Sequence, residues 1–266
     1  MTEEDRSNQK GPAPWLFLFG TLAWTWTWLT PAMLSDGDWL EFPVTLLSAI
    51  GLLGPLIVPA LLIGSGRWDF SLDATIAHFY RRCIDIQGLG KAWTLGVVGL
   101  AIVLAFGPLL LNPSSIAETG LIDAGPVIFL LVGLLGALEE PGWRGYGQEA
   151  LQRRIPVLLA SFIIGIFWAA WHLPLFFIDG TYQNQLGVGT TGFWAFHAAI
   201  ILSAPFYAWL YNAARKIIFA VVLYHGLGNV ARELAPEVTT AAALTVEGVM
   251  TLFVVILSWR WISQTK

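Results

Sequence analysis

The chain has 266 residues, of which 56% are hydrophobic and only 12% are charged, whereas roughly 25% of residues are charged in an ordinary soluble domain. This composition indicates a membrane protein and argues against a soluble globular domain. The formal net charge is −4 and no basic stripe with interleaved aromatic residues occurs, so we expect no nucleic-acid partner.

Apolar runs of about 20 residues, long enough to cross about 30 Å of bilayer hydrocarbon, recur along the whole chain. In chain order they lie at 15–33, 43–65, 92–112, 122–140, 156–178, 193–211, 216–232 and 239–259. The first run is longer than the apolar region of a signal peptide and has no convincing cleavage site, so we expect it to be retained. The sequence therefore predicts an all-α fold, a polytopic membrane bundle of about eight transmembrane helices forming one domain over residues 1–266.

The basic residues indicate how these spans are oriented, because Lys and Arg accumulate in short cytoplasmic loops. With the N-terminus inside, all 14 Lys and Arg residues except Arg232 fall on the cytoplasmic side. The opposite loops, at 34–42, 113–121 and 179–192, contain none. The pattern predicts that both termini are cytoplasmic. Between the second and third spans, segment 66–91 mixes apolar and charged residues and is predicted to form an interfacial amphipathic helix.

Ionisable side chains inside the predicted spans are candidates for function, because each costs several kcal/mol at mid-bilayer unless it faces the bundle interior or water. The candidates are Glu139, Glu140, His172, His197, His225 and Glu247. His197 has no partner at motif spacing and Glu247 is isolated in the last span, so we interpret both as packing residues.

The stretch ALEEPGWRGYGQEALQRR, residues 137–154, ends the fourth span with two adjacent carboxylates, Glu139 and Glu140. If the helix continues through Pro141 and Gly142, Arg144 lies one turn away and an ion pair offsets the burial of both charges. Adjacent carboxylates point about 100° apart on a helix, so we expect them not to face the same spot. One would be a catalytic base and the other a partner of Arg144; a purely structural ion pair is the alternative.

Two further spans carry polar residues at a similar depth, namely His172 in FWAAWHLP and His225 in LYHGLGN. Asn229 follows His225 by four residues and projects from the same helical face. A neutral imidazole and a carboxamide can both donate hydrogen bonds to a developing oxyanion, while Glu139 and His172 can hold and deprotonate a water. For either histidine alone, a hydrogen-bonded core residue is the alternative.

Three motifs in this order, EEPGWR (139–144), WAAWH (168–172) and HGLGN (225–229), resemble the CPBP family of intramembrane proteases, the CAAX prenyl endopeptidase and bacteriocin-processing group. The resemblance covers a motif-bearing core of about 120–235. Trp168 stands where the family usually has Phe, which leaves the shape of the cavity and the choice of substrate open.

The resemblance implies a role for each motif residue. Glu139 would activate the hydrolytic water with His172. His225 and Asn229 would stabilise the tetrahedral oxyanion. Glu140 and Arg144 would support these groups, and either Glu139 or Glu140 could still be the base.

Metal dependence is a separate question, because proteases of this kind have been described as metalloenzymes. Glu139, His172 and His225 with a water would complete a catalytic zinc site, whereas water activation by glutamate and histidine needs no metal. The chain has no His-Glu-x-x-His helix, so we favour a metal-free mechanism and keep zinc as the alternative.

The sequence thus predicts an intramembrane endopeptidase that hydrolyses a membrane-associated or lipid-modified, CAAX-like substrate in the cell membrane, at a site open towards the cytoplasm. Its expected partners are membrane lipids and a peptide or lipidated protein, while oligomeric state and exact substrate stay open. One alternative is a catalytically idle scaffold or bacteriocin-immunity-type binding protein. Another is a transporter with a Glu/His proton relay, although the repeated halves common in transporters are missing.

Overall fold

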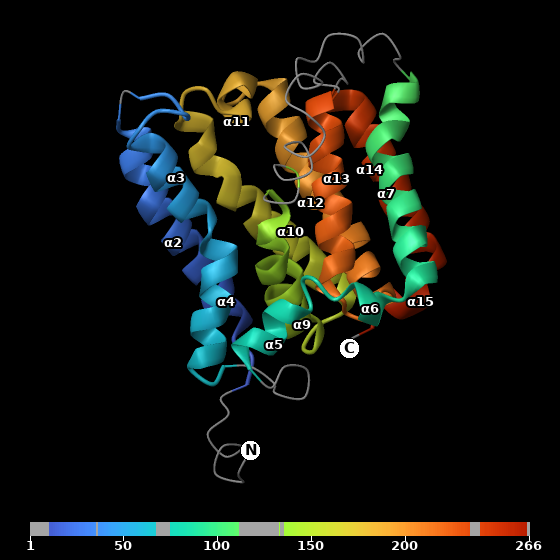
Figure 1. Cartoon of the computed structure of the whole chain (residues 1–266). Coiled ribbons are helices and arrows are strands. Elements are labelled where there is room, and N and C mark those ends of the chain that lie inside the picture. The colour runs from blue at the N-terminus through green and yellow to red at the C-terminus, as the bar shows by residue number, and fades with distance from the viewer. Residues whose placement is uncertain are drawn as a thin grey trace.

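The computed structural model describes residues 11–35, 37–67, 75–111, 133, 136–234 and 240–264, and every regular element in them is a helix (Figure 1). The predicted all-α class is therefore confirmed for the described part of the chain. In chain order the elements are α2 (Pro14–Met33), α3 (Val44–Leu52), α4 (Gly54–Gly64), α5 (Ile76–Arg81), α6 (Ile86–Leu89), α7 (Lys91–Leu111), the 3₁₀ helix η3 (Ala137–Glu139), the π-helix η4 (Pro141–Gln148), α9 (Glu149–Gln152), α10 (Val157–His172), the 3₁₀ helix η5 (Leu173–Phe177), α11 (Tyr182–Leu186), α12 (Thr191–Ala213), α13 (Ile218–Leu234), α14 (Thr240–Leu257) and α15 (Trp259–Ile262).

The predicted spans coincide with these helices except at 122–140, most of which lies outside the described residues. Within the described residues, two helical stretches are long and apolar enough to cross a membrane, Val157–Phe177 and Thr191–Ala213. The pair α3 and α4, bent by 47° at a short break, can count as a third. The described part thus supports two or three candidate spans, and the number eight stays a prediction.

The segment predicted as one interfacial helix, 66–91, contains two short helices among its described residues, α5 and α6. The side chain of Thr75 caps α5 by accepting a hydrogen bond from the His78 N–H, and that of Asp85 caps α6 by accepting from the Gly88 N–H. The second cap starts a new helix after α5 has ended, which explains why the amphipathic pattern does not form one continuous helix.

The helices pack as one bundle, with α10 and α12 against each other between two groups of helices (Figure 1). α2, α3 and α4 form one group, and α7, α13 and α14 lie on the opposite side. Gly165 allows α10 to approach α12 closely, since a Cβ there would lie 3.0 Å from Ala204 Cβ and 3.1 Å from Ile201 Cα. Small residues commonly make such close helix contacts in membranes.

The segment that carries the two adjacent carboxylates stays helical from Ala137 to Gln152 but changes its winding, from 3₁₀ through π to α. Pro141 begins the π-helix, and because proline has no N–H it cannot donate the helical hydrogen bond at that position. Gly142 packs on the backbone of α4, where a Cβ would lie 2.8 Å from the carbonyl carbon of Pro55. π-turns of this kind are frequent at functional sites.

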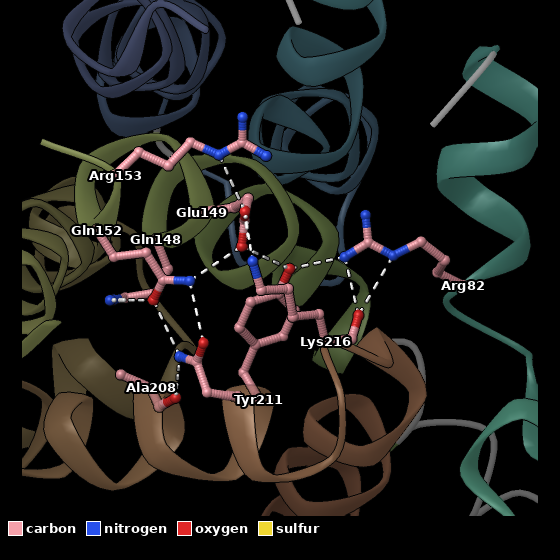
Figure 2. Close-up of polar contacts among 9 residues, drawn as sticks. Arg82, Gln148, Glu149, Gln152, Arg153, Ala208, Tyr211 and Lys216 are labelled. Atoms are coloured by element: carbon pink, nitrogen blue, oxygen red, sulfur yellow. Dashed lines mark hydrogen bonds and ion pairs between the residues drawn. The ribbon is translucent and has the colours of Figure 1, made fainter. Parts of the chain in front are cut away.

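A polar cluster around Glu149 fastens the end of this segment to α12 and to the turn that follows it (Figure 2). The Glu149 carboxylate is fully buried and accepts hydrogen bonds from Arg153 Nε at 3.1 Å, Gln152 Nε2 at 2.9 Å and Lys216 Nζ at 2.8 Å. Gln152 and Asn212 exchange a pair of amide hydrogen bonds of 3.1 and 2.9 Å. The buried negative charge of Glu149 is thus paired with two cations, which offsets the cost of removing it from water.

Arg82, just after α5, extends the same cluster towards α13 (Figure 2). Its Nη2 donates to the Tyr211 hydroxyl at 2.7 Å and to the Lys216 carbonyl at 2.8 Å. The Arg82 carbonyl in turn accepts from the Phe219 N–H at 3.0 Å. These bonds connect the α5 segment, α12 and the start of α13 at the end of the bundle where α2 begins and α15 lies (Figure 1).

Candidate active site

Glu139 ends η3 beneath two tryptophans, and its carboxylate is only 7% exposed. Its Oε2 accepts a hydrogen bond from Trp168 Nε1 at 2.7 Å and another from Trp143 Nε1 at 3.2 Å. Its Oε1 lies 3.5 Å from His225 Nε2. The two carboxylate oxygens therefore have different surroundings, one fixed by indole donors and the other facing a histidine.

Glu140, the next residue, is fully buried and contacts the same histidine from its other edge. Its Oε1 lies 2.7 Å from His225 Nδ1, which donates because a carboxylate only accepts. Its Oε2 lies 3.6 Å from Arg144 Nε, so Glu140 is the carboxylate beside that arginine. The two acids face opposite edges of one imidazole, because its two nitrogens lie on different edges and each acid reaches one of them.

The guanidinium of Arg144 is buried between two aromatic rings. Its Cζ lies 4.6 Å from the centroid of the Trp168 ring and 4.6 Å from that of the Tyr207 ring. A cation over the faces of aromatic rings is stabilised electrostatically, by about 2 kcal/mol or more when it is desolvated. With Glu140 one turn away, these contacts offset part of the cost of burying the arginine, whose three nitrogens make no hydrogen bond within the described part of the chain.

His172 ends α10 and is linked to Glu139 through Trp168. The Nδ1 of His172 donates to the Trp168 backbone carbonyl at 2.9 Å, so in the neutral ring Nε2 is the acceptor. The rings of Trp171 and Phe196 lie against the imidazole, with centroids 4.6 and 5.2 Å away. The arrangement selects the tautomer that can take a proton at Nε2.

Asn229 lies one turn after His225 on α13 and borders the segment of the two acids. A Cβ on Gly136 would lie only 2.5 Å from Asn229 Nδ2. Since Gly136 is one turn before Glu139, the carboxamide lies beside the η3 turn. The structure thus brings the three predicted motifs together from η3, α10 and α13.

The remaining ionisable candidates are explained by packing or lie outside the described side chains. His197 donates from Nδ1 to the Phe193 carbonyl at 2.8 Å and stacks on Phe176 with ring centroids 5.2 Å apart. It is a hydrogen-bonded packing residue, as predicted. The side chain of Glu247 is outside the described residues.

Two contributors were missed by reasoning from the sequence. Tyr207 of α12 contacts Arg144 and lies edge-to-face with His225, with ring centroids 5.8 Å apart. Trp168 was treated as a variant motif residue, although its N–H is a direct donor to Glu139. The chain has 14 tryptophans, and no local sequence pattern distinguishes Trp168, whose indole N–H donates to Glu139, from the others.

The residues suggested for zinc do not form a complete ligand set. Among the residues that the structure describes, no group of three or more His, Cys, Asp or Glu side chains is arranged to hold a metal ion. Two indole donors occupy Glu139 Oε2, and Glu140 occupies His225 Nδ1. A catalytic zinc needs three converging protein ligands, and the described part of the chain shows two facing groups, Glu139 Oε1 and His225 Nε2 at 3.5 Å, without a third beside them.

Comparisons with known proteins match the same part of the chain. A family model described as type II CAAX prenyl endopeptidase Rce1-like matches residues 122–231, which contain all three motifs. The chain is also 29% identical over 231 residues to a CAAX prenyl protease 2 of Methanococcus maripaludis, a match that covers 83% of this chain and 84% of the relative.

Proposed function

We propose that this chain, which belongs to the CPBP family of intramembrane proteases, hydrolyses a peptide bond in a membrane-associated or lipid-modified, CAAX-like substrate. The observation that carries the proposal is the position of the Glu139 carboxylate, with Oε2 fixed by two indoles and Oε1 beside His225. The name of the relative supports the substrate class.

Glu139 is the base in this proposal, and His172 assists it. Water gives a proton to Glu139 Oε1 while its oxygen attacks the carbonyl carbon of the scissile bond. The neutral His172, with Nδ1–H on the Trp168 carbonyl, accepts a hydrogen bond from this water at Nε2. When the C–N bond breaks, the proton on Glu139 passes to the leaving amine, so the carboxylate is regenerated.

His225 and Asn229 stabilise the tetrahedral oxyanion. The Nδ1–H of His225 donates to Glu140 at 2.7 Å, which holds the imidazole with its Nε2 edge towards Glu139 and the reacting atoms, and the Asn229 carboxamide supplies an N–H donor. Preorganised donors of this kind are usually the largest electrostatic contribution to acyl transfer.

The topology proposed for the chain has about eight spans in the cell membrane, both termini cytoplasmic and the site open towards the cytoplasm. Arg82, Arg153 and Lys216 support the orientation, because they meet in one cluster (Figure 2) at the end where α2 begins (Figure 1). Clustered basic residues are typical of the cytoplasmic side.

The mechanism is proposed to be independent of metal, because the described acids and histidines contact each other and the indoles instead of converging on one point. No step above needs an ion. A zinc-dependent mechanism stays the alternative, and a chelator would distinguish it from the metal-free mechanism.

The test is cleavage of a quenched peptide library, with and without a farnesylated cysteine, by the purified protein in detergent. Glu139→Gln keeps the size of the side chain and removes the base, so we expect cleavage by the wild type and none by a folded Glu139→Gln variant. Loss of wild-type cleavage with a chelator and its return with zinc would reverse the metal proposal. A wild type that cuts no peptide would favour the binding-protein alternative.

A further inference from the structure

Trp168 contacts the acid, the arginine and both histidines of the site. Its Nε1 donates to Glu139, its carbonyl accepts from His172, its ring face lies against Arg144, and its ring lies edge-to-face with His225 at 5.5 Å. From this we infer that Trp168 is a positioning residue for Glu139: its indole N–H fixes one carboxylate oxygen so that the other is the proton acceptor. The inference deepens the function proposed above and rests on it.

The hydrogen bond is directed at one oxygen. Trp168 Nε1 lies 2.7 Å from Glu139 Oε2, which is shorter than the 3.2 Å bond from Trp143 to the same atom. A bond to an ionised carboxylate is charge-assisted, and such bonds are about twice as strong as those between neutral groups. Two donors on Oε2 stop the carboxylate from rotating, so Oε1 always faces His225.

The indole itself is held in place by its neighbours. It is 4% exposed, with Arg144 over one ring face at 4.6 Å and Tyr207 edge-to-face at a centroid distance of 5.4 Å. A donor that needs no rearrangement during the reaction is the kind that lowers a barrier. The ring therefore aims the N–H at Glu139 before substrate arrives.

The backbone carbonyl of Trp168 has a second role, which any residue at position 168 could fill. This carbonyl accepts a hydrogen bond from Nδ1 of His172 at 2.9 Å. One turn of α10 therefore determines both the tautomer of His172 and the orientation of Glu139. Only the indole N–H is specific to tryptophan. A substitution that removes this N–H and keeps an aromatic ring therefore isolates the inferred role.

Trp168→Phe makes this change, and Trp24→Phe is the matched control. Trp24 of α2 also donates its indole N–H within the protein, to the Ile50 carbonyl at 2.9 Å, and among the described residues no hydrogen bond or ring contact joins it to Glu139, Arg144, His172 or His225. We expect Trp168→Phe to lower kcat by roughly 10- to 100-fold, from the loss of one hydrogen bond to a charged group, with KM nearly unchanged. Trp24→Phe should leave both constants within about twofold.

An infrared measurement tests the contact without relying on turnover. The difference spectrum between wild type and Glu139→Gln isolates the Glu139 carboxyl band. The same difference in a Trp168→Phe background should give a shifted band, because the strongest donor to Oε2 is gone. In a Trp24→Phe background the band should not move.

The outcomes separate the inference from the proposed function. If the wild type cuts peptides and Trp168→Phe matches Trp24→Phe in kcat, the positioning role is overturned while the protease stands. If the wild type cuts nothing, the proposed function fails, and the infrared band still decides whether Trp168 orients Glu139. An unmoved band in Trp168→Phe overturns the inference in either case.

Discussion

Glu140 and His225, 85 residues apart in the chain, are joined by a buried hydrogen bond of 2.7 Å from Nδ1 to Oε1. This bond connects the η3–η4 segment to α13 and leaves the other edge of the imidazole facing Glu139 at 3.5 Å. The orientation of His225 thus depends on the acid that is not proposed as the base.

Glu140→Gln should therefore slow the reaction without unfolding the protein. The amide oxygen can still accept from His225 Nδ1, but the bond is no longer made to a charged acceptor and loses its charge assistance. We expect kcat to fall roughly 10- to 100-fold, as for the loss of one charge-assisted contact. Steady-state cleavage and a thermal melt in detergent measure this; a Gln variant with wild-type kcat would contradict the orienting role.

Arg144→Ala should act mainly on stability. The guanidinium fills the space between the Trp168 and Tyr207 rings and is the cation beside Glu140. Removing one partner of a buried pair typically costs about 3–5 kcal/mol of unfolding free energy. Unfolding in mixed micelles with increasing SDS would measure the loss.

Arg144→Lys is the control for that substitution, because it keeps the charge but lacks the planar group that stacks on both rings. We expect its loss of unfolding free energy to lie between those of the wild type and the alanine variant. Equal losses for lysine and alanine would mean that stacking alone matters and that the charge of Arg144 does not.

Gly136→Ala should reduce turnover through Asn229. The added Cβ would lie 2.5 Å from Asn229 Nδ2, so the carboxamide or the η3 turn must shift. A displacement of about 1 Å at an oriented catalytic group can cost about 100-fold in rate, and we expect a fall in kcat of that order. Gly228→Ala is the control, since a Cβ there meets no described atom within 4 Å; similar kcat values for the two variants would argue against a role for Asn229.

The spans and motifs were predictable because they depend on local features of the sequence. Apolar runs about 20 residues long located α2, α7, α10, α12, α13 and α14. The depth of polar residues along these runs suggested that His172 and His225 could meet Glu139, and the structure places His225 3.5 Å from Glu139 and links His172 to it through Trp168. The 47° bend between α3 and α4 was not predicted, since the apolar run continues through it without a polar residue.

The details of the site depend on which helices pack together, and that information is not local. Trp168 and Glu139 are 29 residues apart, and Tyr207 reaches Arg144 from yet another helix. That both acids meet one imidazole depends on where α13 places His225, since the ring presents one nitrogen to Glu139 and the other to Glu140. Glu149 was overlooked because it precedes Arg153 and Arg154 and looks like a solvated surface acid.

Glu149→Gln should test whether that buried acid supports the fold and not the chemistry. Its carboxylate joins Arg153, Lys216 and Gln152 across α9 and the turn after α12 (Figure 2). The side chains of Arg153 and Lys216 are 25% and 31% exposed, so each can regain water when the charge of Glu149 is removed. We therefore expect a loss of about 1–3 kcal/mol in unfolding free energy, below the range for a fully buried pair.

The matched control for Glu149→Gln is Arg154→Gln, whose guanidinium makes an exposed hydrogen bond of 2.7 Å to the Pro12 carbonyl and should cost about 0.5 kcal/mol or less. Unfolding in SDS micelles and the kcat of the folded fraction should be measured together. A purely supporting role requires that Glu149→Gln unfolds earlier while its folded fraction turns over like the wild type. A lower kcat in that fraction would instead show that the cluster at the end of the π-helix also sets the positions of Glu139 and Glu140, because the two acids and Glu149 lie on one continuous helical segment.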